Sequence, residues 1–375
     1  MMKKTERNYN YGTKFPFKFE RDAILIPCKM DDTTHLLYYN SAVEGLLHGE
    51  IPANTEFPQC KKTVKIRMKD SSKQSTVYKI GLKYYYMESD FFHFNNMVGI
   101  VTSVLSDTII PMCMSEKKIT EFLIGREFSG TKNAMLLSFS DTTITLFDAQ
   151  HVYDTTGFTP MKLFNSCRGF SVGLTLDSVE YAFVFNTGYE GALGLPQHKK
   201  YQECAIVEGK AQCVFFDVQY EKHKKEKDLC VARCREQNAL KTIIDTLILQ
   251  QTNTISMGDL DAISGDIRYA KGFSRPVMGM GFIAHFDWIL DIDKGKIYAK
   301  KILNIDSFFN PYRVSIFENS LQISSAPLGE PEYQLFSIID SVNGEKINTE
   351  NICQMKEILN RKNGFRDNKI MFIQP

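Results

Sequence analysis

Two polar tripeptides stand at the ends of apolar runs, where a strand would present a side chain for chemistry. Asn40-Ser41-Ala42 follows Leu36-Leu37-Tyr38-Tyr39, and Asn186-Thr187-Gly188 follows Tyr181-Ala182-Phe183-Val184-Phe185. A turn and another apolar run precede each of these runs, which is typical of a β-hairpin. Two side-chain amides can hold a water molecule, but they cannot remove its proton.

The spacing of the two tripeptides indicates an internal repeat. Asn40 and Asn186 lie 146 residues apart, and a second pair of landmarks, Gly125 and Gly279, lies 154 residues apart. Each of these glycines follows a short apolar segment and precedes a further alternating run. Landmarks repeated at nearly one offset are the mark of two related halves.

The order of these features resembles the lobe plan of pepsin-like and retropepsin-like aspartic proteases. In that plan a hairpin and an apolar strand deliver Asp-Thr/Ser-Gly, and an apolar-apolar-Gly segment and a closing hairpin follow. The closing segments look like those of the bacterial two-lobed members. The resemblance implies a mainly β chain with two pseudo-symmetric lobes, at residues 12–150 and 151–303, and one aspartate from each lobe at a shared cleft.

The chain departs from this family at the catalytic positions, because the two aspartates fall on Asn40 and Asn186. Thr187-Gly188 keeps the family pattern, whereas Ser41-Ala42 keeps the hydroxyl and replaces the glycine. Aspartic proteolysis needs two carboxylates that share one proton, and each acid–base group contributes about 10²–10⁴-fold to the rate. The resemblance therefore implies a pseudoenzyme with a hydrolase-like fold, able to bind an extended peptide between its lobes.

Two other interpretations stay open. The chain could be an active aspartic endopeptidase that uses an unrecognised carboxylate, or a purely structural or interaction protein. Asp154 does not supply that carboxylate by pattern, because an extra threonine separates it from Gly157 and no hairpin delivers it; we expect an inter-lobe loop there. The sequence carries no nucleotide-binding, zinc-protease or serine-hydrolase signature.

A polar turn between two alternating runs, Val64–Met68 and Thr76–Ile80, predicts a further hairpin. In a lobe of this plan the hairpin would be a flap over the cleft, and an ordinary solvated hairpin is the alternative. The tip of the flap would contain Asp70, Ser71, Ser72 and Lys73.

Residues 304–375 resemble a PDZ domain. An apolar run leads into Asn343-Gly344, which is a strong hairpin turn, and a helix over Asn351–Arg361 and a strand over Lys369–Ile373 follow. A Gly-Leu-Gly-Phe-type loop for a peptide carboxylate is absent from the sequence. We therefore expect a packing module rather than a peptide receptor.

Composition bounds the partners and cofactors. With 45 basic and 44 acidic residues the net charge is +1, which gives no basic field for nucleic acid. The acidic positions Asp259, Asp261 and Asp266 do not match an EF-hand loop, and no Cys-x-x-Cys pair is present, so we expect no metal and no cofactor. The nine cysteines favour reduced thiols.

The remaining expectations concern single segments and the setting of the chain. Residues 1–11 form a polar tail, and a helix runs from about Leu229 to Leu249. No apolar run is long enough for a transmembrane helix. The start lacks a secretory h-region, so the chain is exported if a leader was removed and cytoplasmic otherwise; its oligomeric state stays open.

Overall fold

The computed structural model describes most of the chain and confirms the mainly β class. The described residues are 6–20, 22–30, 33–42, 46–49, 64–69, 75–89, 92–102, 122–125, 133–166, 169–207, 210–219, 229–238, 241–302, 312–317, 320–328, 333–361 and 363–373.

The N-terminal half contains strands joined by turns, and its described residues include no helix. Strand β1 (Glu6–Tyr9) comes first and pairs with β9, so the predicted polar tail is wrong over these residues. The other strands are β2 (Lys14–Pro16), β3 (Lys18–Glu20), β4 (Ala23–Met30), β5 (Thr33–Asn40), β6 (Leu46–Gly49), β7 (Val64–Lys69), β8 (Ser75–Glu88), β9 (Phe92–Thr102), β10 (Phe122–Gly125), β11 (Ala134–Ser138) and β12 (Thr143–Phe147).

The C-terminal half adds one short helix to the same kind of strand sequence. Its elements are β13 (Thr159–Met161), β14 (Leu163–Ser166), β15 (Gly169–Leu176), β16 (Val179–Phe185), β17 (Leu193–Pro196), β18 (His198–Val207), β19 (Lys210–Gln219), β20 (Leu229–Asn238), β21 (Lys241–Met257), β22 (Leu260–Ala270), β23 (Val277–Met278), α1 (Met280–Ile283), β24 (Phe286–Asp291) and β25 (Lys296–Lys301).

The two halves repeat one set of strand pairings. The hairpin β4–β5 corresponds to β15–β16, and the parallel pair β5–β10 corresponds to β16–β23. The parallel pairs β6–β9 and β17–β22 match in the same way. Even the register repeats, because Leu25 faces Tyr38 and Ser171 faces Val184, at one shared offset of 146. Among the described strands, the hairpin β18–β19 belongs to the C-terminal half alone.

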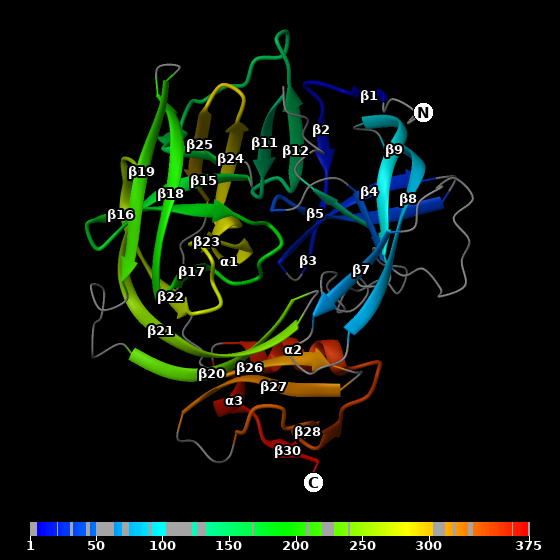
Figure 1. The fold of residues 1–375 in the computed structure, drawn as a ribbon, viewed down its shortest axis with the longest axis vertical. Coiled ribbons are helices and arrows are strands. Elements are labelled where there is room, and N and C mark those ends of the chain that lie inside the picture. The colour runs from blue at the N-terminus through cyan, green and yellow to red at the C-terminus, as the bar shows by residue number, and fades with distance from the viewer. Residues whose placement is uncertain are drawn as a thin grey trace.

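A six-stranded sheet joins the halves. Its order is β13-β25-β24-β11-β12-β2, so each half supplies three strands and the halves meet between β24 and β11. Leu136 faces Ile289 at the middle of that seam. Figure 1 shows the two halves side by side with these strands between them. The sheet therefore fixes how the end of β5 faces the end of β16.

One hydrophobic core runs through both halves. Trp288 on β24 is fully buried, and its ring meets Phe185 at 5.1 Å between centroids. The Trp288 indole N–H donates to the Ile283 carbonyl at 2.9 Å, so the buried polar atom is satisfied. Burying an aromatic side chain of this size contributes about 1.5–3 kcal/mol, and it anchors the strand that ends just before Asn186.

The C-terminal unit has its own apolar cluster and continues the sheet of the half before it. Strand β27 pairs with β20, where Arg233 faces Ala326; Figure 1 shows the unit below the two halves. As expected, Asn343-Gly344 makes a turn, with φ of 53° and 83°. Its elements are β26 (Arg313–Phe317), β27 (Ser320–Pro327), β28 (Ile339–Val342), β29 (Glu345–Lys346), α2 (Ile352–Asn360), α3 (Gly364–Asp367) and β30 (Ile370–Phe372).

Two further local predictions are wrong. The helix expected from Leu229 to Leu249 is instead the antiparallel pair β20–β21, in which β21 also pairs with β15 and β22; partners on both sides outweigh local preference. Cys204 and Cys213, expected to be reduced, form a disulfide across β18–β19. The limits 12–150, 151–303 and 304–375 stay predictions.

Candidate functional site: the asparagine junction between the halves

Two hydroxyl side chains tie the halves together in a reciprocal pattern. The Ser41 N–H donates to Thr187 Oγ1 at 2.9 Å, and the Thr187 N–H donates to Ser41 Oγ at 3.0 Å. Each hydroxyl then donates onward across the junction, Ser41 to the Phe185 carbonyl at 2.8 Å and Thr187 to the Tyr39 carbonyl at 2.9 Å. Both side chains are fully buried, so these bonds are shielded from water.

The two asparagines adopt matching conformations on either side of this pattern. Asn40 Oδ1 accepts the Ala42 N–H at 3.0 Å, and Asn186 Oδ1 accepts the Gly188 N–H at 2.9 Å. A backbone N–H can only donate, so each side-chain amide must direct its oxygen toward that N–H. The Nδ2 group of each amide then points away from this hydrogen bond. The strand ends thus deliver two equivalent amide groups.

Gly188 is the common neighbour of the two asparagines. A Cβ at Gly188 would lie 1.9 Å from Asn40 Nδ2, which means that the Asn40 amide occupies the space a side chain would need. Since Gly188 also holds Asn186 through its N–H, both asparagines contact one residue. The structure therefore brings Asn40, Ser41, Ala42, Asn186, Thr187 and Gly188 together.

Two carboxylates and one lysine lie beside the junction. Burial raises the pKa of Asp22 to about 6, and the negative charge of Glu190 adds to the effect, whereas Lys356 opposes it. Lys356 Nζ lies 3.9 Å from Glu190 Oε1. The same two carboxylates help raise the pKa of Tyr38 after burial, and the Tyr38 hydroxyl lies 3.5 Å from the Thr187 carbonyl.

The pattern analysis did not identify Asp22, Glu190 or Lys356. Glu190 has a signal in the sequence, since it stands four residues after Asn186. Asp22 occupies a left-handed turn with φ of 60°, and Lys356 belongs to α2 of the C-terminal unit. The sequence does not indicate that Asp22 or Lys356 lies near the junction, because their proximity depends on the folded structure. Together they place one group from each part of the chain at this edge of the junction.

The other predicted positions are the tip of the flap and Asp154. Asp70, Ser71, Ser72 and Lys73 lie outside the described residues, although the hairpin β7–β8 that flanks them is present and Lys69 faces Ser75. Asp154 is exposed in a loop and accepts the Thr156 N–H and hydroxyl, as expected of an inter-lobe segment.

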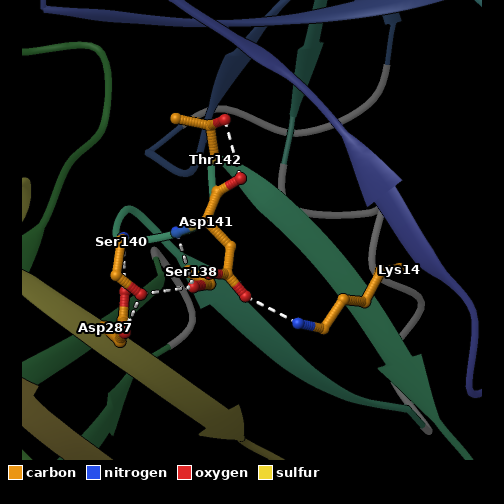
Figure 2. Close-up of polar contacts among 6 residues, drawn as sticks. All are labelled: Lys14, Ser138, Ser140, Asp141, Thr142 and Asp287. Atoms are coloured by element: carbon orange, nitrogen blue, oxygen red, sulfur yellow. Dashed lines mark hydrogen bonds and ion pairs between the residues drawn. The ribbon is translucent and has the colours of Figure 1, made fainter.

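A second polar cluster secures the seam between the halves. Asp287 on β24 accepts the Ser140 N–H at 3.0 Å and the Ser140 hydroxyl at 2.7 Å, as Figure 2 shows. Lys14 pairs with Asp141 in the same turn at 2.6 Å. The Asp287 side chain is buried, so it fixes the β11–β12 turn of one half onto a strand of the other.

The described part of the chain offers no assembled metal centre. Nowhere in it do three or more His, Cys, Asp or Glu side chains gather closely enough to hold an ion. None of its helices is long and apolar enough to cross a membrane.

Comparison with known proteins gives weak structural similarity and no match to a family model or a curated protein. Among solved structures, the chain is similar to basic 7S globulin from soybean, which has a pepsin-like fold. That similarity has a TM-score of 0.39 and 7% sequence identity, and it covers 82% of this chain and 98% of the globulin chain.

Proposed function

We propose that this chain is a catalytically inactive protein of the aspartic-protease type that binds an extended peptide between its two halves. The observation that carries the proposal is the pair of matching asparagines, Asn40 and Asn186, at the ends of corresponding strands. The reciprocal bonds of Ser41 and Thr187 support it, because they hold these strand ends in a fixed relation.

The chemistry of the pair supports binding without cleavage. Water attack on a peptide bond needs a base to remove a proton and an acid to protonate the carbonyl. An amide does neither, and the loss of each group costs about 10²–10⁴-fold in rate. We therefore expect a peptide bound at this junction to remain uncleaved.

The C-terminal unit has a packing role in this proposal. Strand β27 is taken up by β20, and β26 is the last strand of the sheet. The Asn360 side chain from α2 accepts the Val314 N–H at 2.9 Å and donates to the Val314 carbonyl at 3.1 Å. This position on the edge of β26 is thus already paired within the chain, which argues against strand addition by a peptide there.

The test is cleavage of a mixed peptide library between about pH 3 and 7, the range in which a carboxylate pair titrates. The natural chain is compared with the double variant Asn40→Asp, Asn186→Asp. We expect no cleavage by the natural chain and measurable cleavage by the variant, because the variant restores two carboxylates on an unchanged scaffold. Asn343→Asp, in the exposed turn of the C-terminal unit, is the matched control and should stay silent.

Cleavage by the natural chain would contradict the proposal and favour the active-enzyme alternative. The variants Asp22→Asn and Glu190→Gln would then identify the carboxylate used, since these two lie beside the junction. If library peptides are neither bound nor cleaved, the result would contradict the binding proposal and favour the purely structural interpretation.

A further inference from the structure

The hairpin β18–β19 carries its disulfide on the face that points away from the core. Cys204 and Cys213 face each other in the register and are bonded to each other. Successive side chains of a strand point to opposite faces, and Tyr201 and Phe216, three residues away on each strand, stack at 5.0 Å between ring centroids on the inward face. Figure 1 shows the two strands side by side on the outer side of the C-terminal half. The disulfide therefore lies on the solvent side of the hairpin.

The two sulfur atoms differ in their access to solvent. Cys213 lies within the segment 212–215, in which every residue is exposed, Phe215 at 79%. Cys204 is only partly exposed and directly follows Glu203, which is 1% exposed. The rate of thiol–disulfide exchange depends on which sulfur the attacking thiol can reach. A thiol in solution therefore meets Cys213 first.

The inward face holds the hairpin in place by contacts that do not involve the disulfide. The ring of Phe216 is buried against Phe164 at 5.6 Å and Tyr181 at 6.5 Å between centroids. Glu203 is buried and forms an ion pair with Arg275 from the segment before β23. Breaking the sulfur–sulfur bond leaves these contacts intact, so the two thiols stay opposite each other on the paired strands.

We propose that Cys204–Cys213 is a thiol-exchange site, at which a small external thiol of the glutathione type attacks Cys213 and releases Cys204. The inference does not depend on the proposed peptide binding. The external thiolate bonds to Cys213 Sγ, and the electron pair of the broken bond leaves on Cys204 Sγ, which takes a proton from solvent. The product is a mixed disulfide on Cys213 beside a free Cys204 thiol.

The mixed disulfide has two further reactions. A second external thiol attacks the sulfur of the first one and frees Cys213, so that one protein disulfide is reduced while two external thiols are oxidised to their own disulfide. Alternatively, Cys204 attacks Cys213 from the facing strand and expels the external thiol, which restores the original bond. The modification is thus reversible, and the two cysteines have separate roles in it.

The first experiment traps the mixed disulfide on the oxidised full chain. The folded protein is incubated with reduced glutathione, and samples are quenched with excess N-ethylmaleimide at short times. Trypsin cleaves after Lys and Arg, so Cys204 falls in residues 201–210 and Cys213 in residues 211–222. Mass spectrometry without reductant then shows which cysteine carries glutathione and which carries maleimide.

We expect glutathione on Cys213 and maleimide on Cys204, about fivefold or more in excess of the reverse arrangement, because access decides which sulfur is attacked. Cys28 is the internal control. It is buried, and burial raises the pKa of its thiol to about 12, so it should carry neither label in the folded chain. Equal labelling, glutathione mainly on Cys204, or a bond that opens only in denaturant would overturn the proposal.

A second experiment measures the two thiols separately. In Cys204→Ser only Cys213 of the pair remains, and in Cys213→Ser only Cys204 remains. Oxidised glutathione should modify Cys213 about fivefold faster than Cys204 in the folded variants, and at equal rates in guanidinium chloride, where both thiols are accessible. Equal rates in the folded variants would contradict the assignment. If either variant does not fold, the trapping experiment on the natural chain decides.

Discussion

At the scale of single residues, the junction depends on atoms that cannot be exchanged for others of the same size. The hydroxyl groups of Ser41 and Thr187 each donate one hydrogen bond and accept another across the halves. A methyl group in place of either hydroxyl would leave one backbone N–H and one backbone carbonyl without a hydrogen-bond partner. The sequence predicted which residues meet here, because Asn-Ser-Ala and Asn-Thr-Gly each end an apolar strand. It could not predict that Asn40 rests on Gly188, since that contact depends on how the halves are placed.

Thr187→Val tests the hydroxyl bonds directly. The valine keeps the shape but leaves the Ser41 N–H and the Tyr39 carbonyl without their partner. Each buried group left unpaired costs about 1–3 kcal/mol, so the loss of both partners should lower the free energy of unfolding by about 2–6 kcal/mol. Urea denaturation followed by Trp288 fluorescence measures it. Thr187→Ser, which retains the hydroxyl, is the control, and equal stability of the two variants would show that the hydroxyl does not contribute.

At the scale of elements, the strands that the sequence predicted are those whose turns lie nearby in the chain. The hairpins before Asn40 and Asn186 and the Asn343-Gly344 turn are local, and the turn residues reveal them. The sequence predicts a helix over β20–β21 because the local pattern does not show the distant strands that pair with them. These strands are β27, which pairs with β20, and β15, which pairs with β21. The sequence did not predict the polar groups around Asp22 and Asp287 for the same reason, because their partners lie far away in the chain.

The hairpin β18–β19 gives a prediction at this scale. Cys204 and Cys213 face each other in its register and are joined by a disulfide. Closing so short a loop stabilises the folded state by about 2–3 kcal/mol at most. The double variant Cys204→Ser, Cys213→Ser should therefore unfold at lower urea concentration than the oxidised natural chain. A peptide map without reductant should show the two cysteines linked; finding both as free thiols would refute the assignment.

At the scale of the whole molecule, three parts of the chain meet in one small charged group. Asp22 belongs to the N-terminal half, Glu190 to the C-terminal half and Lys356 to the C-terminal unit. The central asparagines carry no titratable group, so a response of this junction to pH must come from its edge. Asp22 is the group to examine, because its pKa in the folded state, about 6, lies above the ordinary value of 3.8 for an aspartate.

The sign of the pH effect follows from that shift. Between about pH 4 and 6 the folded state holds a proton on Asp22 that the unfolded state has released, so this residue's contribution to stability falls as pH rises. Asp22 is exposed, although the protein packed around its carboxyl group partly desolvates it, so screening by solvent reduces the size of the effect. Urea denaturation at pH 4, 5, 6 and 7 should show a decline that is weaker in Asp22→Asn.

Lys356→Gln provides the companion measurement. Lys356 lowers the pKa of Asp22, so its removal should carry the decline to higher pH. Identical pH profiles for the natural chain and both variants would mean that the three parts do not share this charge coupling. A change in Lys356→Gln alone would show that Lys356 acts on stability through a group other than Asp22.

The seam through the six-stranded sheet bears on how the molecule assembles with copies of itself. Its order reads the same from either edge, with β11 of one half against β24 of the other. This is the arrangement of an isologous dimer, in which equivalent surfaces bind each other around a twofold axis. Here both surfaces belong to one chain and satisfy each other internally. The twofold pairing is closed within one chain, so a second copy of the chain would find β11 and β24 already paired with each other at this seam.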